Sequence, residues 1–340
     1  MNNFIEMSKY AGMREDLVQA GGGNSAYKIS RERMAIKASG YQLADVRADQ
    51  GYAIVNPQVI RNAFLNGAEL EGMTEADAKE ILAQAFLEGE RPSIETFLHA
   101  VSGRYSLHTH PIVVNILTSR AGGMDMLQEM FPEALMVPYA TPGVELAKVY
   151  FKKYQQHGRG ISVVFLQNHG LLVSAETADE AMEKTEHTVR RIEEHLNMDM
   201  SAYHAVTQLY HAYKDGIIWR VTDQNVKQAQ EVLGRVWDSA FCPDCVVFLG
   251  KRMFDAGNRL DGKELDRFRA AYGEPAVIAY QKEIYLHAPS VKKALEMQSV
   301  LSFSAQVMLA NAGHECHMLS RQEQDFLLGW DAEKYRKNIR

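Results

Sequence analysis

Apolar residues recur along the chain with two different spacings, and each spacing predicts a type of element. Residues 1–17 have the pattern of an amphipathic helix. Residues 21–55 contain three short strand-like runs, "GGGNSAYKI", "RMAIKASGYQL" and "GYAIV", which glycine and polar turns separate. Residues 57–90 have the pattern of two helices. The chain is therefore predicted to begin with a helix, a set of neighbouring strands and a helical pair.

Helices and strands alternate in the next part. "PSIETFLHAVS" carries apolar residues with helical spacing and predicts a core-facing helix that begins at Pro92. "YSLHTH" is typical of a strand, and "PIVVNILTSRAG" of a helix. "ISVVFLQNHGLLVS" predicts two strands joined by a tight turn. Thr177 and Glu180 then have capping-box spacing and open a long helix, with which we expect a first domain to end near residue 200.

The remaining residues predict an α+β extension. Helical patterns occupy residues 203–214, 223–238 and 290–311, and "CVVFLG" and "AVIAYQKEIYLHA" have the character of strands. No linker rich in Gly, Pro or Ser separates the two parts. We therefore expect residues 201–340 to pack on a domain formed by residues 1–200.

The composition narrows the class of protein. The 340 residues include 37 basic and 43 acidic side chains, a balance of −6 that argues against nucleic acid as the main partner. Three cysteines in a chain of this length indicate a reducing compartment rather than a disulfide scaffold. The N-terminus lacks the apolar core of a signal peptide, and no apolar run has the length of a membrane span. These features favour a cytoplasmic protein with no membrane partner.

Three histidines have the placement of metal ligands. Successive side chains of a strand alternate between its faces, so His108 and His110 point the same way. His169 lies at the predicted turn of "QNHGLL", where a polar side chain can face a cleft. Imidazole suits zinc, and a catalytic zinc typically has three protein ligands and one open position. The alternative is that all three are ordinary hydrogen-bonded histidines of a strand and a turn.

Glu95 and two glycine-containing turns are further candidates for function. A helical interpretation turns Glu95 toward the apolar side, where an unpaired charge is costly unless it meets a cation; the alternative is an exposed glutamate at a helix start. "GGGNS" and "KASG" resemble turns that cradle phosphate, with Asn24, Ser25 and Ser39 as short donors and Lys37 as a charge. Ordinary turn chemistry explains each turn separately.

Taken in order, these motifs resemble the class II aldolase/adducin family. The resemblance runs through "GGGNSAYKI", "IKASG", "PSIETFLH", "HTHP", "VPYATPGVELA" and "LQNHGLLV" and covers most of residues 1–200. "RPSIETFLHA" followed by "HTHP" looks like the aldolase portion of rhamnulose-phosphate aldolases fused to short-chain dehydrogenases. The resemblance implies a three-layer α/β/α fold with a central, mainly antiparallel sheet, and a homotetramer with active sites between subunits.

The resemblance also implies roles for individual residues. A zinc ion would be held by His108, His110 and His169. Glu95 would be the acid/base at the nucleophilic carbon, and Tyr139 would protonate the aldehyde oxygen across a subunit boundary. The positions that match the family's phosphate site are Gly23, Asn24, Ser39, Gly40 and Ser93. Ile94 stands where some fuculose-phosphate aldolases have serine, so one hydroxyl donor is missing.

The implied activity is the reversible cleavage of a ketose 1-phosphate to dihydroxyacetone phosphate and an aldehyde. Breaking that carbon–carbon bond leaves an enediolate, whose negative charge a fixed zinc cation stabilises. Related sugar-phosphate 4-epimerases typically have aspartate at the Glu95 position, and decarboxylases of phosphorylated 3-oxo acids share the fold. An adducin-like assembly protein is the non-catalytic alternative, but such members lack the metal histidines.

A second metal site is an alternative for the C-terminal part. "CPDC" at Cys242 to Cys245 and "HECH" at His314 to His317 contain suitable ligand types but lie far apart in the chain. Cys316 belongs to the second motif. The sequence leaves open whether these residues bind zinc or are ordinary cysteines and histidines.

Overall fold

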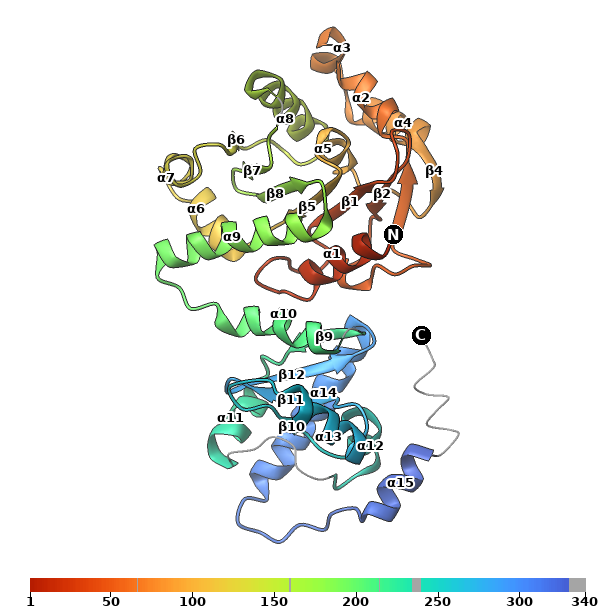
Figure 1. The fold of residues 1–340 in the computed structure, drawn as a ribbon, viewed down its shortest axis with the longest axis vertical. Coiled ribbons are helices and arrows are strands. Elements are labelled where there is room, and N and C mark those ends of the chain that lie inside the picture. The colour runs from red at the N-terminus through yellow and green to blue at the C-terminus, as the bar shows by residue number, and fades with distance from the viewer. Residues whose placement is uncertain (66, 159, 214, 234–239, 330–340) are drawn as a thin grey trace. The chain divides into compact units, whose positions relative to one another are not determined.

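The strand-like runs near the N-terminus pair as neighbouring strands of one sheet. The computed structural model describes all residues except 66, 159, 214, 234–239 and 330–340. It divides into two units, Met1–Met200 and Ser201–Arg340, and each unit has a sheet of its own (Figure 1).

The sheet of the first unit has eight strands in the order β4-β3-β2-β1-β5-β8-β7-β6. All neighbours are antiparallel except β6 and β7, which are parallel. The predicted mainly antiparallel sheet is therefore confirmed. The strands are β1 (Asn24–Lys28), β2 (Met34–Lys37), β3 (Tyr52–Val55), β4 (Phe86–Gly89), β5 (Tyr105–Thr109), β6 (Leu135–Val137), β7 (Val163–Leu166) and β8 (Gly170–Ala175).

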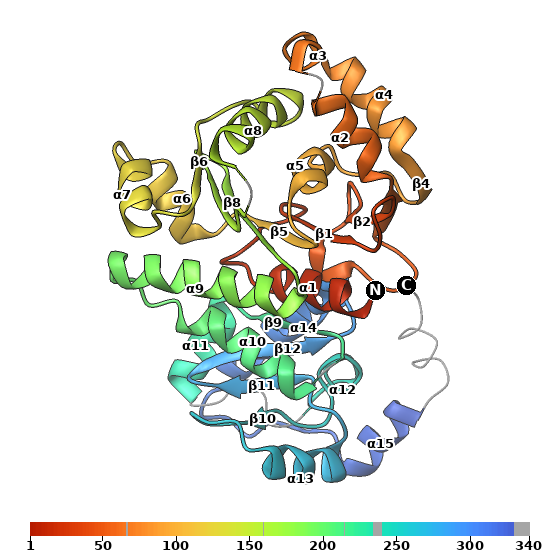
Figure 2. The ribbon, with the colours of Figure 1, turned by 45° about the horizontal axis from the view of Figure 1, so that its top comes forward.

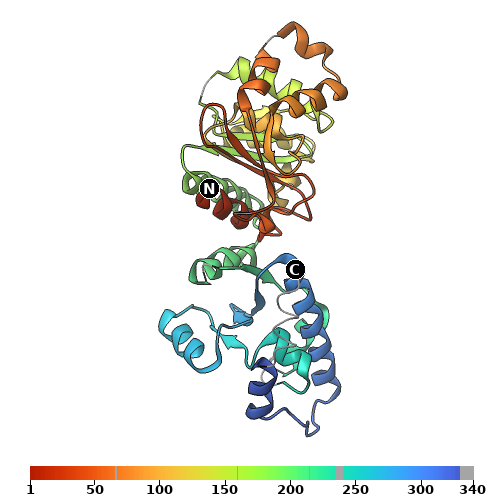
Figure 3. The same ribbon diagram turned by 90° about the vertical axis from the view of Figure 1, so that its right-hand side faces the viewer.

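Helices cover both faces of this sheet and complete the predicted three layers. The helices are α1 (Asn2–Gly12), η1 (Leu43–Asp45), α2 (Pro57–Leu65), α3 (Gly67–Gly72), α4 (Glu75–Ala85), α5 (Thr96–Val101), α6 (Ile112–Thr118), α7 (Gly123–Met130), α8 (Val144–His157) and α9 (Ala178–Leu196). Helices α1 and α9 lie together on one face, and α2, α4, α5 and α8 lie on the other (Figure 2). The view in Figure 3 shows α1 and α9 side by side.

The apolar core on the α5 face holds that helix in place. The Phe64 ring of α2 lies 5.0 Å from Phe97 of α5 and 4.4 Å from Phe151 of α8, between ring centroids. All three side chains are buried. Burying an aromatic side chain contributes roughly 1.5–3 kcal/mol, so this cluster fixes α5 and the residue that precedes it, Glu95.

Two predictions for residues 57–101 are wrong. Among the described residues, 57–90 contain the helices α2, α3 and α4 and also the strand β4, so the prediction of helices as far as residue 90 is wrong. The helix predicted to begin at Pro92 begins at Thr96. Pro92 instead pairs with Ala38 as an isolated β-bridge, and the Ser39 N–H donates to the Arg91 carbonyl at 2.9 Å. Because these contacts hold residues 91–92 extended, the helix starts one turn later.

The second unit has a four-stranded sheet in the order β10-β11-β12-β9. Its strands are β9 (Ile217–Arg220), β10 (Phe254–Asp255), β11 (Val277–Tyr280) and β12 (Glu283–Ala288). Its helices are α10 (Ser201–Tyr213), α11 (Gln224–Leu233), α12 (Pro243–Leu249), α13 (Gly262–Tyr272), α14 (Val291–Ala310) and α15 (Arg321–Gly329). The strands predicted in "AVIAYQKEIYLHA" are confirmed. Part of the helix predicted over residues 223–238 lies outside the described residues.

The strand predicted in "CVVFLG" is wrong, because this segment is the helix α12. Pro243 occupies its first turn, where proline's fixed φ favours a helix. Cys245, Val246 and Leu249 are buried. The helical spacing of these three residues outweighs the strand preference of two adjacent valines.

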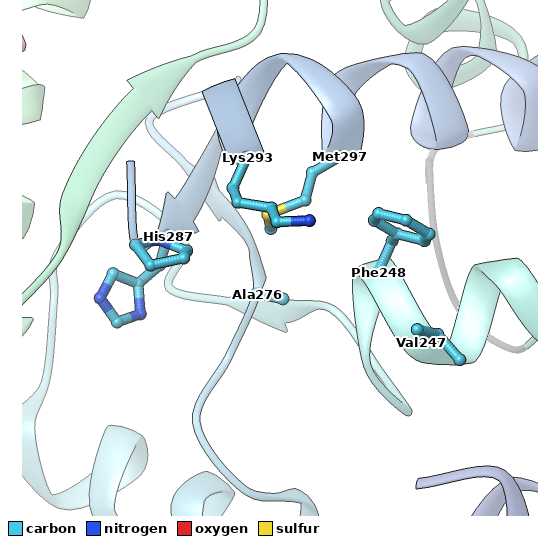
Figure 4. A pocket seen from close by; sticks show the side chains of 7 residues that line it. Val247, Phe248, Ala276, His287, Lys293 and Met297 are labelled. Atoms are coloured by element: carbon cyan, nitrogen blue, oxygen red, sulfur yellow. The ribbon is translucent and has the colours of Figure 1, made fainter. Parts of the chain in front are cut away.

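A cavity of about 230 Å³ lies beside α12 in the second unit (Figure 4). The Lys293 side chain extends from α14 toward Phe248 of α12, and Met297 follows one turn later on α14. The Lys293 ammonium lies 2.7 Å from the Glu296 carboxylate and 5.8 Å from the Phe248 ring centroid. The cavity is lined by Val247, Phe248, Ala276, His287, Pro289, Lys293 and Met297. Within the described part of the chain, no helix has the length and apolar character needed to cross a membrane.

Candidate metal and substrate site

Three histidines and one glutamate converge in the first unit. The potential ligand atoms of Glu95, His108, His110 and His169 all lie within 4.8 Å of one another. Nε2 of His108 lies 3.1 Å from Nε2 of His110 and 3.2 Å from Nε2 of His169. Oε1 of Glu95 lies 3.5 Å from Nε2 of both His108 and His169. The structure thus brings together four residues that the sequence singled out.

Strand pairing fixes the orientation of His108. The strand β5 pairs with β1 on one side and with β8 on the other, where His108 stands opposite Leu172. The side chain is fully buried, and its Nδ1 lies 3.0 Å from the Leu171 carbonyl oxygen. Because a carbonyl can only accept, Nδ1 carries the proton and donates. In the neutral ring, the unprotonated Nε2 therefore faces the cluster, and this is the tautomer that binds a metal.

A backbone hydrogen bond holds His110, which lies directly after the end of β5. Its N–H donates to the Leu17 carbonyl at 2.7 Å. The chain near Leu17 is fixed in turn by the buried Arg14, whose guanidinium binds both oxygens of Asp16 at 2.7 and 2.6 Å. Arg14 also contacts Glu186 of α9 at 2.6 Å. This buried ion pair therefore links α9 to the segment that positions His110.

The turn between β7 and β8 places His169. The His169 N–H donates to the Leu166 carbonyl at 3.1 Å, and Asn168 adopts a left-handed φ of 54°. Gly170 follows directly, and a Cβ on it would lie 2.2 Å from the Thr109 carbonyl oxygen. Any side chain at position 170 would therefore push the turn away from β5. The glycine allows His169 to approach His108 and His110.

The electrostatics of the cluster keep Glu95 ionised. Burial raises the pKa of Glu95, but the charges and hydrogen bonds of His108 and His169 outweigh burial and hold it well below its usual value. Burial, followed by the charges of His108 and His169, lowers the pKa of His110 to about 3. At neutral pH His110 is therefore an uncharged imidazole, the form that binds a metal.

This set of donors fits a divalent cation. Nε2 of His108 lies close to Nε2 of both His110 and His169. One proton between two of these nitrogens forms a hydrogen bond in only one of the two contacts. A single cation can accept a lone pair from each of the three rings. Three imidazoles with one carboxylate suit zinc and other borderline metals. His108, His110 and His169 would hold the ion, with Glu95 beside it.

The residues of the predicted phosphate site lie on three turns. Gly23 has a φ of +70° and precedes Asn24, which is buried and whose side-chain oxygen has no hydrogen-bond partner among the described residues. An unpaired buried oxygen is costly, and a ligand or water would relieve that cost. Ser39 and Gly40 follow β2 and are exposed. Ser93 accepts the Glu95 N–H at 3.3 Å, so its turn is directly joined to the metal cluster.

Lys37 has a different place from the one its sequence suggested. Its side chain is buried, and its ammonium donates to the Gly21 carbonyl at 2.8 Å and to the Gly23 carbonyl at 3.3 Å. Burial lowers the pKa of Lys37, and the negative charge of Glu95 acts against that shift. Lys37 therefore stabilises the turn formed by Gly21, Gly22 and Gly23 through hydrogen bonds to its backbone.

A cavity of about 750 Å³ adjoins these turns. It is lined by Ser39, Glu75, Lys79, Leu82, Ala83, Phe86, Arg91, Pro92, Ser93, Ile94, Pro142 and Gly143. Its two cations, Lys79 and Arg91, were not among the residues predicted from the sequence. For neither cation does the described structure record an ion pair with a carboxylate. Glu75, in contrast, accepts the Val144 N–H at 2.9 Å. The position of Arg91 directly before "PS" is the sequence feature that could have indicated a role in the site.

Two other candidates are not members of the metal cluster that the described residues form. The Tyr139 side chain is 59% exposed, and the Tyr139 N–H donates to the Gln167 side chain at 3.1 Å. Cys242 and Cys245 lie with their sulfurs 3.2 Å apart. Over the part of the chain that the structure describes, "CPDC" and "HECH" do not form a group of three or more converging ligands; the four-residue cluster around His108 is the only such group.

Comparison with known proteins identifies the family. The model of the class II aldolase and adducin N-terminal domain matches residues 2–196. The chain belongs to the class II aldolase and adducin family. The resemblance carried by the sequence motifs is thereby confirmed. Among solved structures, the family domain is similar to the N-terminal class II aldolase domain of a conserved protein from Thermoplasma acidophilum. That similarity has 25% identity and a TM-score of 0.51, and it covers 57% of this chain and 92% of that one.

A curated relative is also similar to part of this chain. It is an uncharacterised oxidoreductase, YuxG, from Bacillus subtilis strain 168, with 24% identity over 213 residues. The match covers 58% of this chain but only 30% of the relative. The similarity therefore concerns one part of that longer protein.

Proposed function

We propose that this chain is a metal-dependent class II aldolase that cleaves a ketose 1-phosphate, or a closely related phosphorylated sugar, into dihydroxyacetone phosphate and an aldehyde. The observation that carries the proposal is the convergence of His108, His110, His169 and Glu95 beside a cavity with hydroxyl and cationic groups. Family membership supports the reaction class. The reaction is reversible and belongs to the carbon–carbon lyases.

The metal cluster supplies two functions. His108, His110 and His169 would hold a divalent metal, for which zinc is our assignment, and that ion would supply a fixed positive charge for the anion left when the carbon–carbon bond breaks. Glu95 carries the proton at the carbon that becomes the nucleophile. Its backbone N–H is held by Ser93, and its carboxylate lies 3.5 Å from two of the histidines. The carboxylate is therefore held in one position at the edge of the site.

The turns and the cavity bind the phosphate. We assign Gly23, Asn24, Ser39, Gly40 and Ser93 to this role. Ile94 supplies no hydroxyl donor, and Arg91 and Lys79 provide charge on the same cavity wall. A guanidinium binds phosphate oxygens in a fixed, forked geometry, so Arg91 also orients the substrate.

Tyr139 requires a second subunit to act. Its phenol is largely exposed on the single chain, as expected for a group that completes the site of a neighbouring copy. We propose a homo-oligomer, with a tetramer favoured, in which Tyr139 protonates the aldehyde oxygen. Residues 1–200 would then be the catalytic domain, and residues 201–340 would pack on it and help to select the aldehyde.

The Glu95→Gln variant tests the proposal. We expect it to keep one metal ion per chain, because the three histidines remain, while kcat falls by about 10²–10⁴-fold with the loss of the proton carrier. A panel of ketose 1-phosphates, assayed for released dihydroxyacetone phosphate, gives the rate, and elemental analysis gives the metal. Glu194→Gln, at an exposed position of α9, is the matched control.

The products separate the aldolase from its alternatives. Full activity of Glu95→Gln would contradict the role of Glu95. A C4-inverted sugar phosphate without free dihydroxyacetone phosphate would indicate an epimerase, and carbon dioxide release from a phosphorylated 3-oxo acid would indicate a decarboxylase. Folded protein that is purified without chelator and contains no divalent metal would favour an adducin-like assembly role.

A further inference from the structure

The "CPDC" segment of the second unit places two thiols in contact. Cys242 lies directly before α12, and Cys245 lies in the first turn of this helix. Both are free cysteines, and their sulfurs are 3.2 Å apart. A disulfide bond is about 2.05 Å long, so the sulfurs need to approach by only about 1 Å to form one. The local backbone therefore already holds the pair close to the geometry of a disulfide.

The two cysteines differ in their access to solvent. Cys242 is partly exposed, whereas Cys245 is fully buried. Burial, and then the neighbouring Cys242, raise the pKa of the Cys245 thiol to about 12. A reagent in solution therefore meets Cys242 first, and Cys245 reacts with a partner that is already attached to Cys242. Dithiol sites that exchange disulfides have this division between an attacking and a resolving thiol.

The surroundings favour a redox pair over a metal site. The pair has no third cysteine, histidine or carboxylate converging on it among the residues that the structure describes. The buried Ser304 of α14 is a polar neighbour of Cys245. On another part of α12, Val247 and Phe248 border the cavity of about 230 Å³ (Figure 4). That space gives α12 room for the small shift that closes the sulfurs.

We propose that Cys242 and Cys245 form a reversible dithiol–disulfide site whose substrate is a low-molecular-weight disulfide. The Cys242 thiolate attacks one sulfur of the substrate, forms a mixed disulfide and releases the first thiol. Cys245 then loses its proton and attacks the Cys242 sulfur, which releases the second thiol and leaves an intrachain disulfide. The two cysteines are oxidised by two electrons, and the substrate disulfide is reduced to two thiols.

The test uses the full chain and oxidised glutathione. Reduced protein has three free cysteines, and we expect one to remain after oxidation, with an intact mass lower by two hydrogen atoms. Alkylation followed by peptide mass spectrometry should find Cys316 still free. Because this measurement uses the unaltered chain, it does not depend on whether a variant folds.

Variants then assign the roles of the two thiols. Cys245→Ser should retain one glutathione on Cys242, whereas Cys242→Ser should form neither a stable adduct at Cys245 nor a disulfide. Cys316→Ser is the matched control and should oxidise like the unaltered chain. Folded protein that keeps three free thiols, or a disulfide that includes Cys316, would overturn the proposal. A second zinc per chain that is lost in Cys242→Ser would also overturn it. None of these measurements depends on aldolase activity.

Discussion

The two units contain two sets of residues that suit a metal, and only one set converges. In the first unit, His108, His110 and His169 meet because β5 and the β7–β8 turn belong to one sheet. In the second unit, "CPDC" and "HECH" have equally suitable side chains but form no such group within the described residues. Ligand types alone therefore do not define a site. Ligands on separate segments of the chain converge only where a sheet or another secondary structure holds those segments at a fixed distance.

The largest expected effect comes from removing one ligand of the convergent set. His110→Ala should lose the bound metal and aldolase activity together, because two imidazoles and a carboxylate hold a divalent ion far more weakly. Elemental analysis and the dihydroxyacetone phosphate assay measure both effects. His157→Ala, at an exposed histidine of α8, is the control and should retain both. A His110→Ala protein with full metal content would show that the cluster is not the binding site.

The next effect tests the support behind His110. Arg14→Ala should lower the free energy of unfolding by about 3–5 kcal/mol, because it leaves the buried Asp16 without its partner. Urea denaturation measures this loss. Arg190→Ala removes an arginine that is 54% exposed and also contacts Glu186, and it should cost less than about 1 kcal/mol. Equal losses in the two variants would contradict the role of the buried pair.

A pH dependence of stability, of similar or smaller size, comes from His99, whose Nδ1 lies 2.6 Å from the Ser106 hydroxyl of β5. His99 is fully buried, and burial lowers its pKa from 6.5 to about 3. The unfolded chain therefore binds one more proton between these values, and the free energy of unfolding falls as the pH drops from about 6.5 toward 3. His99→Gln should remove a part of this fall on the order of a few kcal/mol. Denaturation midpoints measured across that pH range would detect it, and an unchanged slope would refute it.

A weaker effect is expected at the edge of the same site. Arg91→Gln should raise KM for the phosphorylated substrate by about tenfold and leave kcat nearly unchanged, because the role we propose for Arg91 is to bind the phosphate and not the reacting carbons. Inorganic phosphate should also compete less well in this variant. Arg33→Gln, which removes an exposed arginine paired with Glu88, is the control. A fall in kcat with constant KM would place Arg91 in the chemistry instead.

The smallest expected effect completes the comparison. Replacing Cys242 and Cys245 together with serine should leave the metal content at one ion per chain, because the four residues of the proposed metal site all belong to the first unit. Elemental analysis of this double variant beside His110→Ala separates the two candidate sets. A loss of metal in the double variant would mean that the second unit also binds metal.

The sequence was sufficient where local rules decide the structure. Alternation along a strand predicted that His108 and His110 share a face, and the capping box of Thr177 and Glu180 is present, with the Glu180 N–H donating at 3.2 Å. It was insufficient where distant contacts decide. Because Pro92 forms a β-bridge with Ala38, α5 begins only at Thr96, and Glu95 lies before the helix. The packing of α12 turns a valine-rich run into a helix. Lys79 and Arg91 line one cavity only because the fold brings their two segments of the chain together.

The hydrogen bond from His108 to the Leu171 carbonyl has a consequence for folding. This bond exists only when β5 and β8 pair in one register, with Thr109 opposite Leu171. A slip by one residue would turn His108 to the opposite face of the sheet. Metal affinity is therefore a measure of correct strand alignment at the centre of the sheet. A metal that binds only this alignment stabilises it against misregistered forms in proportion to the metal concentration.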